Sequence, residues 1–386
     1  MAFLPKFPPG LRNKIATERL KGTMDPRYRL VWRRLGAGAG PRTHCDCWHK
    51  VSLLNLGVAV ARETFTTATV PLAAAWIVLL RNMVTNDDYL RWRENGPGIG
   101  RDARIAFSGL LGRFMARAYL MKSQDVRVLV PLDTAKRYLE GTPYSIRKDP
   151  HERGLEADWI GLGGSRLVIA EAKGTFDRAI SAWNGPDRRP TALETALGQA
   201  KRTAVFKSPS ANPLPAKRWA VASRWATEEN DLCPVLVAWD PDDGPLDRDD
   251  YRELARVLHR ADIEGVLKGL GHREAVDALD DGAPTERLPG EIGLRVNGRS
   301  LEPGVAAVVG PVGLRPLRGR EDLEYVRRIR ELTPNVAVVS LSSRYAGASI
   351  TDRERVADPE DGGNVATRAG LTVAWLSDEP DIGIEG

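Results

Sequence analysis

The sequence contains few of the residues on which disulfide scaffolds, zinc cages and catalytic triads depend. Its 386 residues include three cysteines and five histidines. So few cysteines exclude a disulfide-stabilised secreted scaffold and make a reducing cytoplasm the expected compartment. No Gly-x-Ser-x-Gly segment is present and the histidines occupy no triad context, so a nucleophilic hydrolase is not expected. The glycine cluster at 96–100 lacks a Gly-Lys-Ser/Thr ending, which argues against a phosphate-binding loop.

Long apolar runs are missing too. The most apolar stretch, residues 68–80, is too short to span a bilayer and is typical of a buried helix. The first ten residues lack the apolar core and the small-residue cleavage site of a signal peptide. The sequence therefore predicts a cytoplasmic protein without a membrane segment.

Charge is present in both signs but is unevenly distributed. The net charge is +5 and the pI about 9.1. Residues 1–50 hold eleven Lys/Arg against three Asp/Glu, whereas residues 351–386 hold nine acids against three arginines. A basic arm and an acidic tail suit a polyanionic partner such as nucleic acid. Solvated chain ends explain the same distribution equally well.

Composition and periodicity divide the chain into three predicted regions. Residues 1–98 are basic and, from about 48 to 94, carry apolar residues at helical spacings, so this region is predicted to be mostly helical. Residues 99–272 alternate helical and strand-like patterns. Residues 273–386 form a further α/β region with the acidic tail, whose last residues, 379–386, are expected to have little order.

The central region carries the clearest pattern of secondary structure. Two strand-like runs within 154–176 are joined at Gly163-Gly164, which is a hairpin signal. The order is helix, three strands, helix, two strands and helix, which predicts an α/β fold with a mixed sheet flanked by helices. These elements are expected at 101–122, 126–133, 154–176, 191–206, 217–226, 233–240 and 248–270.

The stretch VIAEAKGTF, residues 168–176, ends an apolar strand in two charges. Read at period 2, Glu171 and Lys173 share the face of Ile169. Both faces are apolar until the charged pair, which is typical of a central strand covered on both sides. Because charges removed from water are costly, Glu171 and Lys173 need each other, a metal ion or a wet cleft.

The hairpin places a second carboxylate beside the first. Asp158 is expected near Glu171 across the ladder. Two adjacent carboxylates repel each other, and a divalent cation removes the repulsion because Mg²⁺ prefers hard oxygen ligands. Lys173 would point into the same cleft, where it could orient the attacking water or offset charge in the transition state.

Asp, a variable hairpin and Glu-x-Lys form the core motif of the PD-(D/E)XK nuclease superfamily, and the sequence resembles it at EADWIGL and LVIAEAKG. The resemblance extends to the order of elements over roughly residues 100–245. It implies a restriction-endonuclease-like core and Mg²⁺- or Mn²⁺-dependent cleavage of phosphodiester bonds, preferably of DNA, in restriction, phage defence or repair. Asp158 and Glu171 match the metal ligands, and Lys173 matches the catalytic lysine.

The resemblance implies further site residues. The carbonyl of Ala172 would add a metal ligand. Gln199 lies where exonuclease-like members carry a supporting glutamine, although a solvated helix position explains it equally well. Lys201 and Arg202 follow it and could reach phosphate. Since many relatives of this fold act as dimers, a homodimer or a partner subunit is allowed.

The sequence departs from the motif in two places. Many members carry a glutamate on the first core helix, but the helix expected at 101–122 contains one acid, Asp102, at its start. Glu156, which would share a strand face with Asp158, could take that role, or two carboxylates could suffice. Ala157 precedes the motif aspartate where proline is usual. These departures concern the number of metal ions more than the assignment.

Other interpretations remain open. A zinc site at 43–50 would use His44, Cys45, Cys47 and His49, but no second ligand pair follows. Trp32 and Trp48 could stack on bases. A second function class is a nucleic-acid-binding or scaffold subunit that kept the fold and lost the chemistry, and a third is an interaction subunit whose acidic segments recruit a basic partner.

Overall fold

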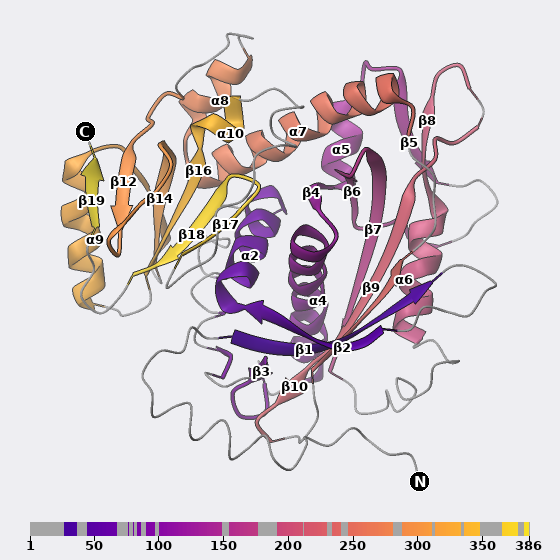
Figure 1. Ribbon diagram of the computed structural model, residues 1–386, viewed down its shortest axis with the longest axis horizontal. Helices are drawn as coiled ribbons and strands as arrows, with labels where there is room; N and C mark the ends of the chain where they lie inside the picture. The colour runs from indigo at the N-terminus through magenta and orange to yellow at the C-terminus, as the bar shows by residue number, and fades with distance from the viewer. Residues whose placement is uncertain are drawn as a thin grey trace. The chain divides into compact units, whose positions relative to one another are not determined.

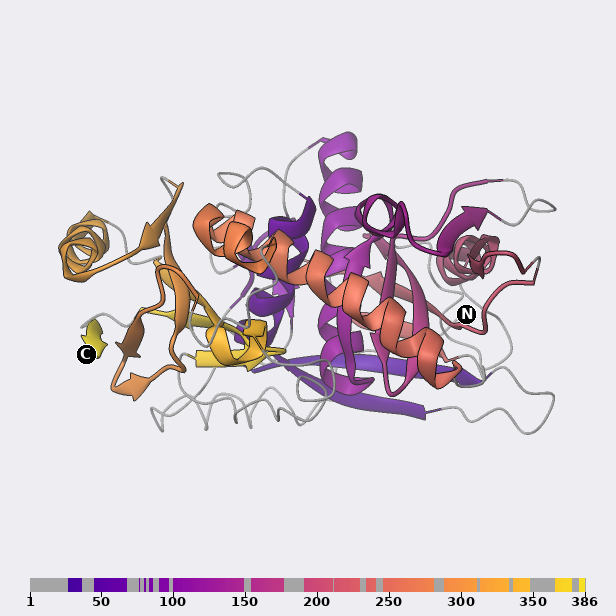
Figure 2. The same cartoon turned by 90° about the horizontal axis from the view of Figure 1, so that it is seen from above.

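The computed structural model describes most of the chain (Figures 1 and 2). Two compact units are present, one formed by Met1–Leu53 with Met83–Leu258 and the other by Leu54–Asn82 with His259–Gly386. The described residues are 27–36, 45–67, 76, 80, 83–85, 90–96, 100–148, 154–176, 191–210, 212–229, 234–240, 246–280, 288–310, 313–332, 336–347, 365–376 and 382–385.

The first unit is built on a seven-stranded mixed sheet with the order β2-β1-β11-β9-β7-β6-β4. The pairs β1–β11 and β7–β9 are parallel and the other neighbours are antiparallel. The predicted mixed α/β class is therefore confirmed. Its strands are β1 (Arg27–Gly36), β2 (Cys45–Ser52), β4 (Val126–Pro131), β6 (Trp159–Gly163), β7 (Arg166–Thr175), β9 (Lys217–Arg224) and β11 (Val235–Asp240).

Helices and two short sheets complete this unit. The strand β5 pairs with β8, and β3 pairs with β10. The helix α7 (Arg248–Leu270) begins here. The remaining elements are β3 (Arg91–Trp92), α4 (Arg101–Ser123), α5 (Leu132–Leu139), β5 (Tyr144–Lys148), α6 (Thr191–Arg202), β8 (Thr203–Lys207) and β10 (Ala226–Thr227).

Alternation along β9 explains why α4 and α6 cover opposite faces of the sheet (Figures 1 and 2). Trp219 points toward α4, where its ring meets Tyr119 edge-on with 6.2 Å between centroids. Ala220 and Ala222 point the other way and pack in one apolar cluster with Leu193 of α6. Period-2 alternation thus buries both sides of the central strands.

The turn between β6 and β7 fixes which residues face each other across the hairpin. Gly164 and Ser165 have φ values of 55° and 61°, so both central residues are left-handed, as in the tight turns that favour hairpins. The register pairs Trp159 with Ala170. The turn lies one residue later than expected, and Asp158 comes directly before the strand, opposite Glu171.

Several sequence-based expectations for this unit need correction. The first region is predicted to be a basic arm and then helical; it forms β1 and β2, and the helical prediction is confirmed from Leu53, where α2 (Leu53–Thr67) begins. The arginines of RYRLVWRRLG obscured a strand pattern with alternating apolar positions. The turn-rich passage after β4 contains α5 and β5. The helix expected at 191–206 ends at Arg202 because TAVFK, rich in strand-forming residues, begins β8.

The second unit contains an antiparallel five-stranded sheet and a three-stranded sheet, with orders β15-β14-β16-β18-β17 and β13-β12-β19. Strands expected near residues 291–298, 304–310 and 335–343, and the helix at 320–332, are confirmed. The elements are α2 (Leu53–Thr67), α8 (Arg273–Asp280), β12 (Gly293–Val296), β13 (Arg299–Ser300), β14 (Gly304–Gly310), β15 (Gly313–Leu317), α9 (Arg320–Leu332), β16 (Ala337–Ser342), α10 (Ser343–Gly347), β17 (Val365–Arg368), β18 (Leu371–Trp375) and β19 (Ile382–Glu385).

Two features of this unit concern its stability. The strand β19 pairs with β12, so the expectation of little order at the end of the chain is wrong over these residues. Arg62 of α2 forms a buried ion pair with Asp262 of α7 and also donates to the carbonyl of Ala369. Both ion-pair side chains are 1% exposed. The pair ties two helices to the turn between β17 and β18.

Candidate active site

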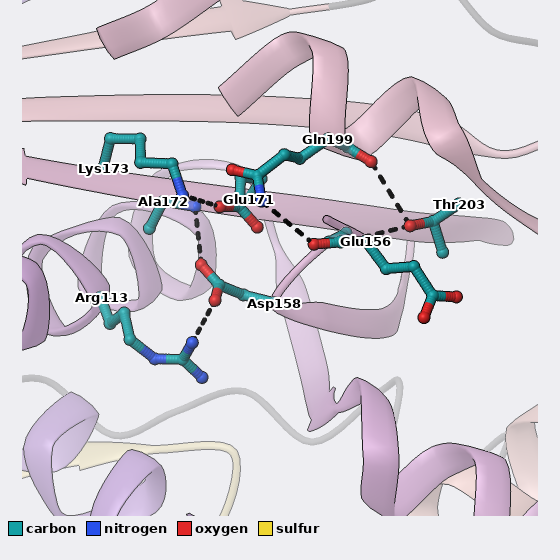
Figure 3. A network of polar contacts seen from close by, with 9 residues as sticks. Arg113, Glu156, Asp158, Glu171, Ala172, Lys173, Gln199 and Thr203 are labelled. Carbon is teal, nitrogen blue, oxygen red and sulfur yellow. Dashed lines mark hydrogen bonds and ion pairs between the residues drawn. The ribbon is translucent and has the colours of Figure 1, made fainter. Parts of the chain in front are cut away.

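Asp158 is held at the entrance of β6 by three elements (Figure 3). Its carbonyl accepts the backbone N–H of Leu132, at the start of α5, at 3.0 Å. Its Oδ2 accepts the backbone N–H of Ala172 in β7 at 3.0 Å. Its Oδ1 forms an ion pair with Arg113 of α4. The predicted position of Asp158 beside Glu171 is therefore confirmed.

Glu171 is buried in the middle of the sheet, with 1% of its side chain exposed. Lys173, on the same strand face, pairs with Oε1. Oε2 is buried and has no hydrogen-bond partner in the described structure. The pKa of Glu171 is raised to about 8, first by burial and then by the Asp158 carboxylate, against the lowering effect of Lys173. An ionised Glu171 is thus under-compensated by the protein alone.

The side chain of Gln199 extends from α6 toward the region of Glu171 (Figure 3). Its side chain is buried, and Nε2 donates to the Glu156 carbonyl at 3.4 Å. Its Oε1 is buried and unpartnered within the part of the chain that the structure describes. Gln199 is therefore no solvated helix residue, and it directs an oxygen without a donor toward the region of Glu171.

The sequence predicts that Glu156 shares a strand face with Asp158, but in the structure it does not. The segment before Trp159 is irregular, and the Glu156 carboxylate turns to Lys136 of α5, with 2.7 Å between Oε2 and Nζ. Its backbone carbonyl instead supports Gln199. The suggestion that Glu156 replaces the missing helix glutamate is wrong for this conformation.

Thr203 supports the site and was missed by sequence reasoning. Its side chain is buried, and its Oγ1 accepts the backbone N–H of Ala157 at 2.8 Å. The same hydroxyl donates to the Gln199 carbonyl at 3.4 Å. One threonine therefore joins the segment before Asp158 to the end of α6. Its signal in the sequence was weak, because it was assigned to the interior of a helix.

Arg113 was missed as well, because acidic residues alone were sought on the first core helix. Its guanidinium pairs with Asp158 and lies over the ring of Trp159, with 4.7 Å from Cζ to the ring centroid.

The two residues predicted to contact phosphate, Lys201 and Arg202, have different surroundings. Lys201 is exposed, whereas Arg202 is half-buried and packs against Gly154, whose φ is +120°. Whether they bind nucleic acid stays a prediction.

The donor atoms fit a small hard cation. Within the described ranges, Glu171 and Gln199 each present a buried oxygen without a partner, and Asp158 lies across the hairpin from Glu171. All are hard oxygen donors of the kind that Mg²⁺ and Mn²⁺ bind. Among the described residues, no group of three or more His, Cys, Asp or Glu could hold a metal ion. Further ligands would be water and the predicted carbonyl of Ala172.

Other sequence candidates cannot be placed. His44 lies outside the described residues, as do the side chains of Cys45, Cys47 and His49 in β2. The zinc interpretation therefore stays a hypothesis. The same holds for base stacking by the side chains of Trp32 and Trp48.

Comparisons of the chain with protein-family models, with curated proteins and with solved structures found no significant match. Within the described helices, none combines the length and the apolar character that crossing a bilayer requires.

Proposed function

We propose that this chain is a divalent-metal-dependent nuclease with a restriction-endonuclease-like core, and that DNA is its preferred substrate. The observation that carries the proposal is the arrangement of Asp158, Glu171 and Lys173 at one edge of the hairpin. A buried, unpartnered carboxylate oxygen beside a second carboxylate is costly in a protein that holds no cation. In a protein that binds a cation, the same oxygen can serve as a metal ligand.

The surrounding fold supports the same proposal. With α5, β5 and β8 set aside, the elements follow the order α4, β4, β6, β7, α6, β9, and the strands lie as β4-β6-β7-β9 with a parallel last pair. This agrees with the order of elements and the mixed, helix-flanked sheet that the sequence resemblance implies. Asp158, directly before β6, and Glu171 and Lys173 of β7 correspond to the Asp and the Glu-x-Lys of the nuclease motif.

The chain's own residues have separate roles in this proposal. Asp158, Glu171 and the Ala172 carbonyl would hold Mg²⁺ or Mn²⁺, with Gln199 supporting the same region. The bound cation supplies Lewis-acid activation of the phosphodiester and of water. Lys173, whose side chain is 32% exposed, orients the attacking water and offsets negative charge on phosphorus oxygens. The water oxygen forms a new bond to phosphorus as the bond from phosphorus to the leaving oxygen breaks, and the proton that the water releases to solvent balances the proton that the leaving oxygen takes up.

The test is cleavage of supercoiled DNA, linear duplex, single-stranded DNA and RNA with Mg²⁺, with Mn²⁺ and with chelator. The proposal requires metal-dependent cutting by wild type that is lost in Glu171→Gln and Lys173→Ala. Two exposed residues supply matched controls, Glu194→Gln on α6 and Lys148→Ala on β5, and both should cut like wild type. Cutting that persists in chelator, or that survives both site variants, would refute it.

One observation favours the alternative of an inactive nucleic-acid-binding or scaffold subunit. Arg113 and Lys173 pair with Asp158 and Glu171, so the formal charges of the four groups balance without a cation when both carboxylates are ionised. Such a charge balance is what we would expect of a site that has lost metal binding. Titration of Mn²⁺ into wild type and Asp158→Ala separates the two functions. Equal, negligible binding by both proteins, with salt-dependent DNA binding retained, would establish the alternative.

A further inference from the structure

Arg113 forms an ion pair with Asp158, one of the carboxylates proposed to bind the metal ion. Its guanidinium forms an ion pair with Asp158 Oδ1, while Oδ2 of the same carboxylate accepts the Ala172 N–H at 3.0 Å. The guanidinium also stacks on Trp159, the residue that follows Asp158. The Arg113 side chain is 25% exposed, so a molecule entering the site from solvent can reach it (Figure 3).

The backbone that carries Arg113 is fixed. One helical turn later, the buried Arg117 lies over the same Trp159 ring at 5.7 Å and donates to the Leu129 carbonyl of β4 at 2.9 Å. Next to Arg113, Gly112 packs directly on the backbone of Gly174, just past the end of the Glu-x-Lys motif. These contacts hold the helix on the sheet, whereas the long side chain of Arg113 can change its partner by rotamer changes.

We propose that Arg113 is a phosphate-binding residue of this site. It pairs with Asp158 while no cation is bound, and it turns to a phosphate of the nucleic acid when a divalent cation takes that carboxylate. This inference rests on the proposed function and names a substrate contact within it.

Charge balance is the physical reason. When both carboxylates are ionised, as cation binding requires, Asp158 and Glu171 are matched by Arg113 and Lys173, so a divalent cation adds two positive charges to a neutral set. The cation and the guanidinium compete for the same carboxylate and repel each other. A phosphodiester restores the balance, and its oxygens match the planar fork of the guanidinium. Metal and substrate therefore bind cooperatively, each favouring the other.

Because Arg113 and the cation compete for Asp158, Arg113→Ala should change metal binding and DNA cleavage in opposite directions. Arg113→Ala removes the competitor, so metal alone should bind more tightly. The same variant loses a phosphate contact, so cleavage should slow. A purely structural role of Arg113 would weaken both properties, because Asp158 would lose its position. The two readouts together therefore distinguish a phosphate-binding residue from a structural one.

The experiment is calorimetric titration of Mn²⁺ alone into the full chain, followed by cleavage assays on DNA. Arg113→Ala should bind Mn²⁺ about tenfold more tightly than wild type and cut at least about tenfold more slowly. Arg113→Lys keeps the competing charge and should bind Mn²⁺ like wild type. Arg101→Ala removes an exposed arginine of the same helix and should change neither property.

Equal or weaker Mn²⁺ binding by Arg113→Ala, in a wild type that binds Mn²⁺ and cuts DNA, overturns the inference and leaves the proposed function intact. Absence of both Mn²⁺ binding and cleavage in wild type overturns the two together. If thermal melting shows that Arg113→Ala does not fold, Arg113→Gln keeps the length of the side chain without its charge. The same expectations apply to it.

Discussion

Asp158 and Glu171 face each other across the open end of the β6–β7 hairpin, and the two carboxylates differ in burial and in hydrogen-bond partners. The Asp158 side chain is 18% exposed, and both of its oxygens have partners from the protein. The Glu171 side chain is 1% exposed, and one oxygen has no partner within the described structure. Burial therefore penalises the ionised form of Glu171 far more than that of Asp158.

The first prediction concerns pH. In the folded, metal-free chain Glu171 keeps its proton up to a pKa of about 8, compared with an ordinary value of 4.5. Between these two values the folded state binds more protons than the unfolded state, so raising the pH favours unfolding. The free energy of unfolding measured with urea in chelator should therefore fall as the pH rises from about 4.5 to about 8.

Glu171→Gln carries no titratable group and should reduce this dependence on pH. The exposed Glu194→Gln on α6 should retain the wild-type slope. Mn²⁺ should reverse the effect in wild type, because a cation binds the ionised carboxylate and stabilises the folded state by mass action. Identical slopes for wild type and Glu171→Gln would show that Glu171 ionises normally.

The second prediction concerns Thr203, whose hydroxyl accepts the Ala157 N–H and donates to Gln199. Thr203→Val keeps the shape of the side chain but leaves the Ala157 N–H without its acceptor. The free energy of unfolding should drop by about 1–3 kcal/mol, and Mn²⁺ binding should weaken because the segment before Asp158 loosens. Thr203→Ser, which keeps the hydroxyl, should preserve Mn²⁺ binding. Loss of Mn²⁺ binding in the serine variant instead would assign the effect to the methyl group.

The features of the site that could be predicted are those that local sequence patterns determine. The position of Asp158 opposite Glu171 follows from local sequence, because a short turn and period-2 alternation fix the register. This is a short-range relationship, and the structure agrees with it. The expectation for Gln199 came instead from the resemblance to the nuclease motif.

The contacts that sequence reasoning missed are long-range. Arg113 meets Asp158 across 45 residues and Thr203 meets Ala157 across 46. No periodicity reports which helix residue lies over a given strand end. The strands β1 and β2 were missed for another reason. Arginines interrupt the apolar pattern of β1, which pairs with the distant β11, and β2 in turn pairs with β1. Long-range pairing therefore overrides the local propensity of these segments.

The third prediction concerns the buried pair in the second unit. Asp262→Ala leaves Arg62 charged, buried and without its carboxylate. The free energy of unfolding should fall by about 3–5 kcal/mol. The double variant Arg62→Met with Asp262→Leu removes both charges and should recover most of this loss, as measured by urea unfolding. A double variant that is no more stable than the single one would mean that the backbone contact from Arg62 to Ala369 dominates.

The last prediction compares two glycines of α4 by urea unfolding and Mn²⁺ titration. A Cβ on Gly112 would lie 2.6 Å from Gly174 Cα, whereas a Cβ on Gly109 would meet nothing within 4 Å. Gly112→Ala should therefore destabilise the fold by about 1–3 kcal/mol, because two backbones must separate. Gly109→Ala should stabilise it by about 0.5–1 kcal/mol through helix propensity. Separating α4 from β7 also withdraws Arg113 from Asp158, so Gly112→Ala alone should alter Mn²⁺ affinity. Equal effects of the two substitutions would mean that α4 does not rest on β7 through this contact.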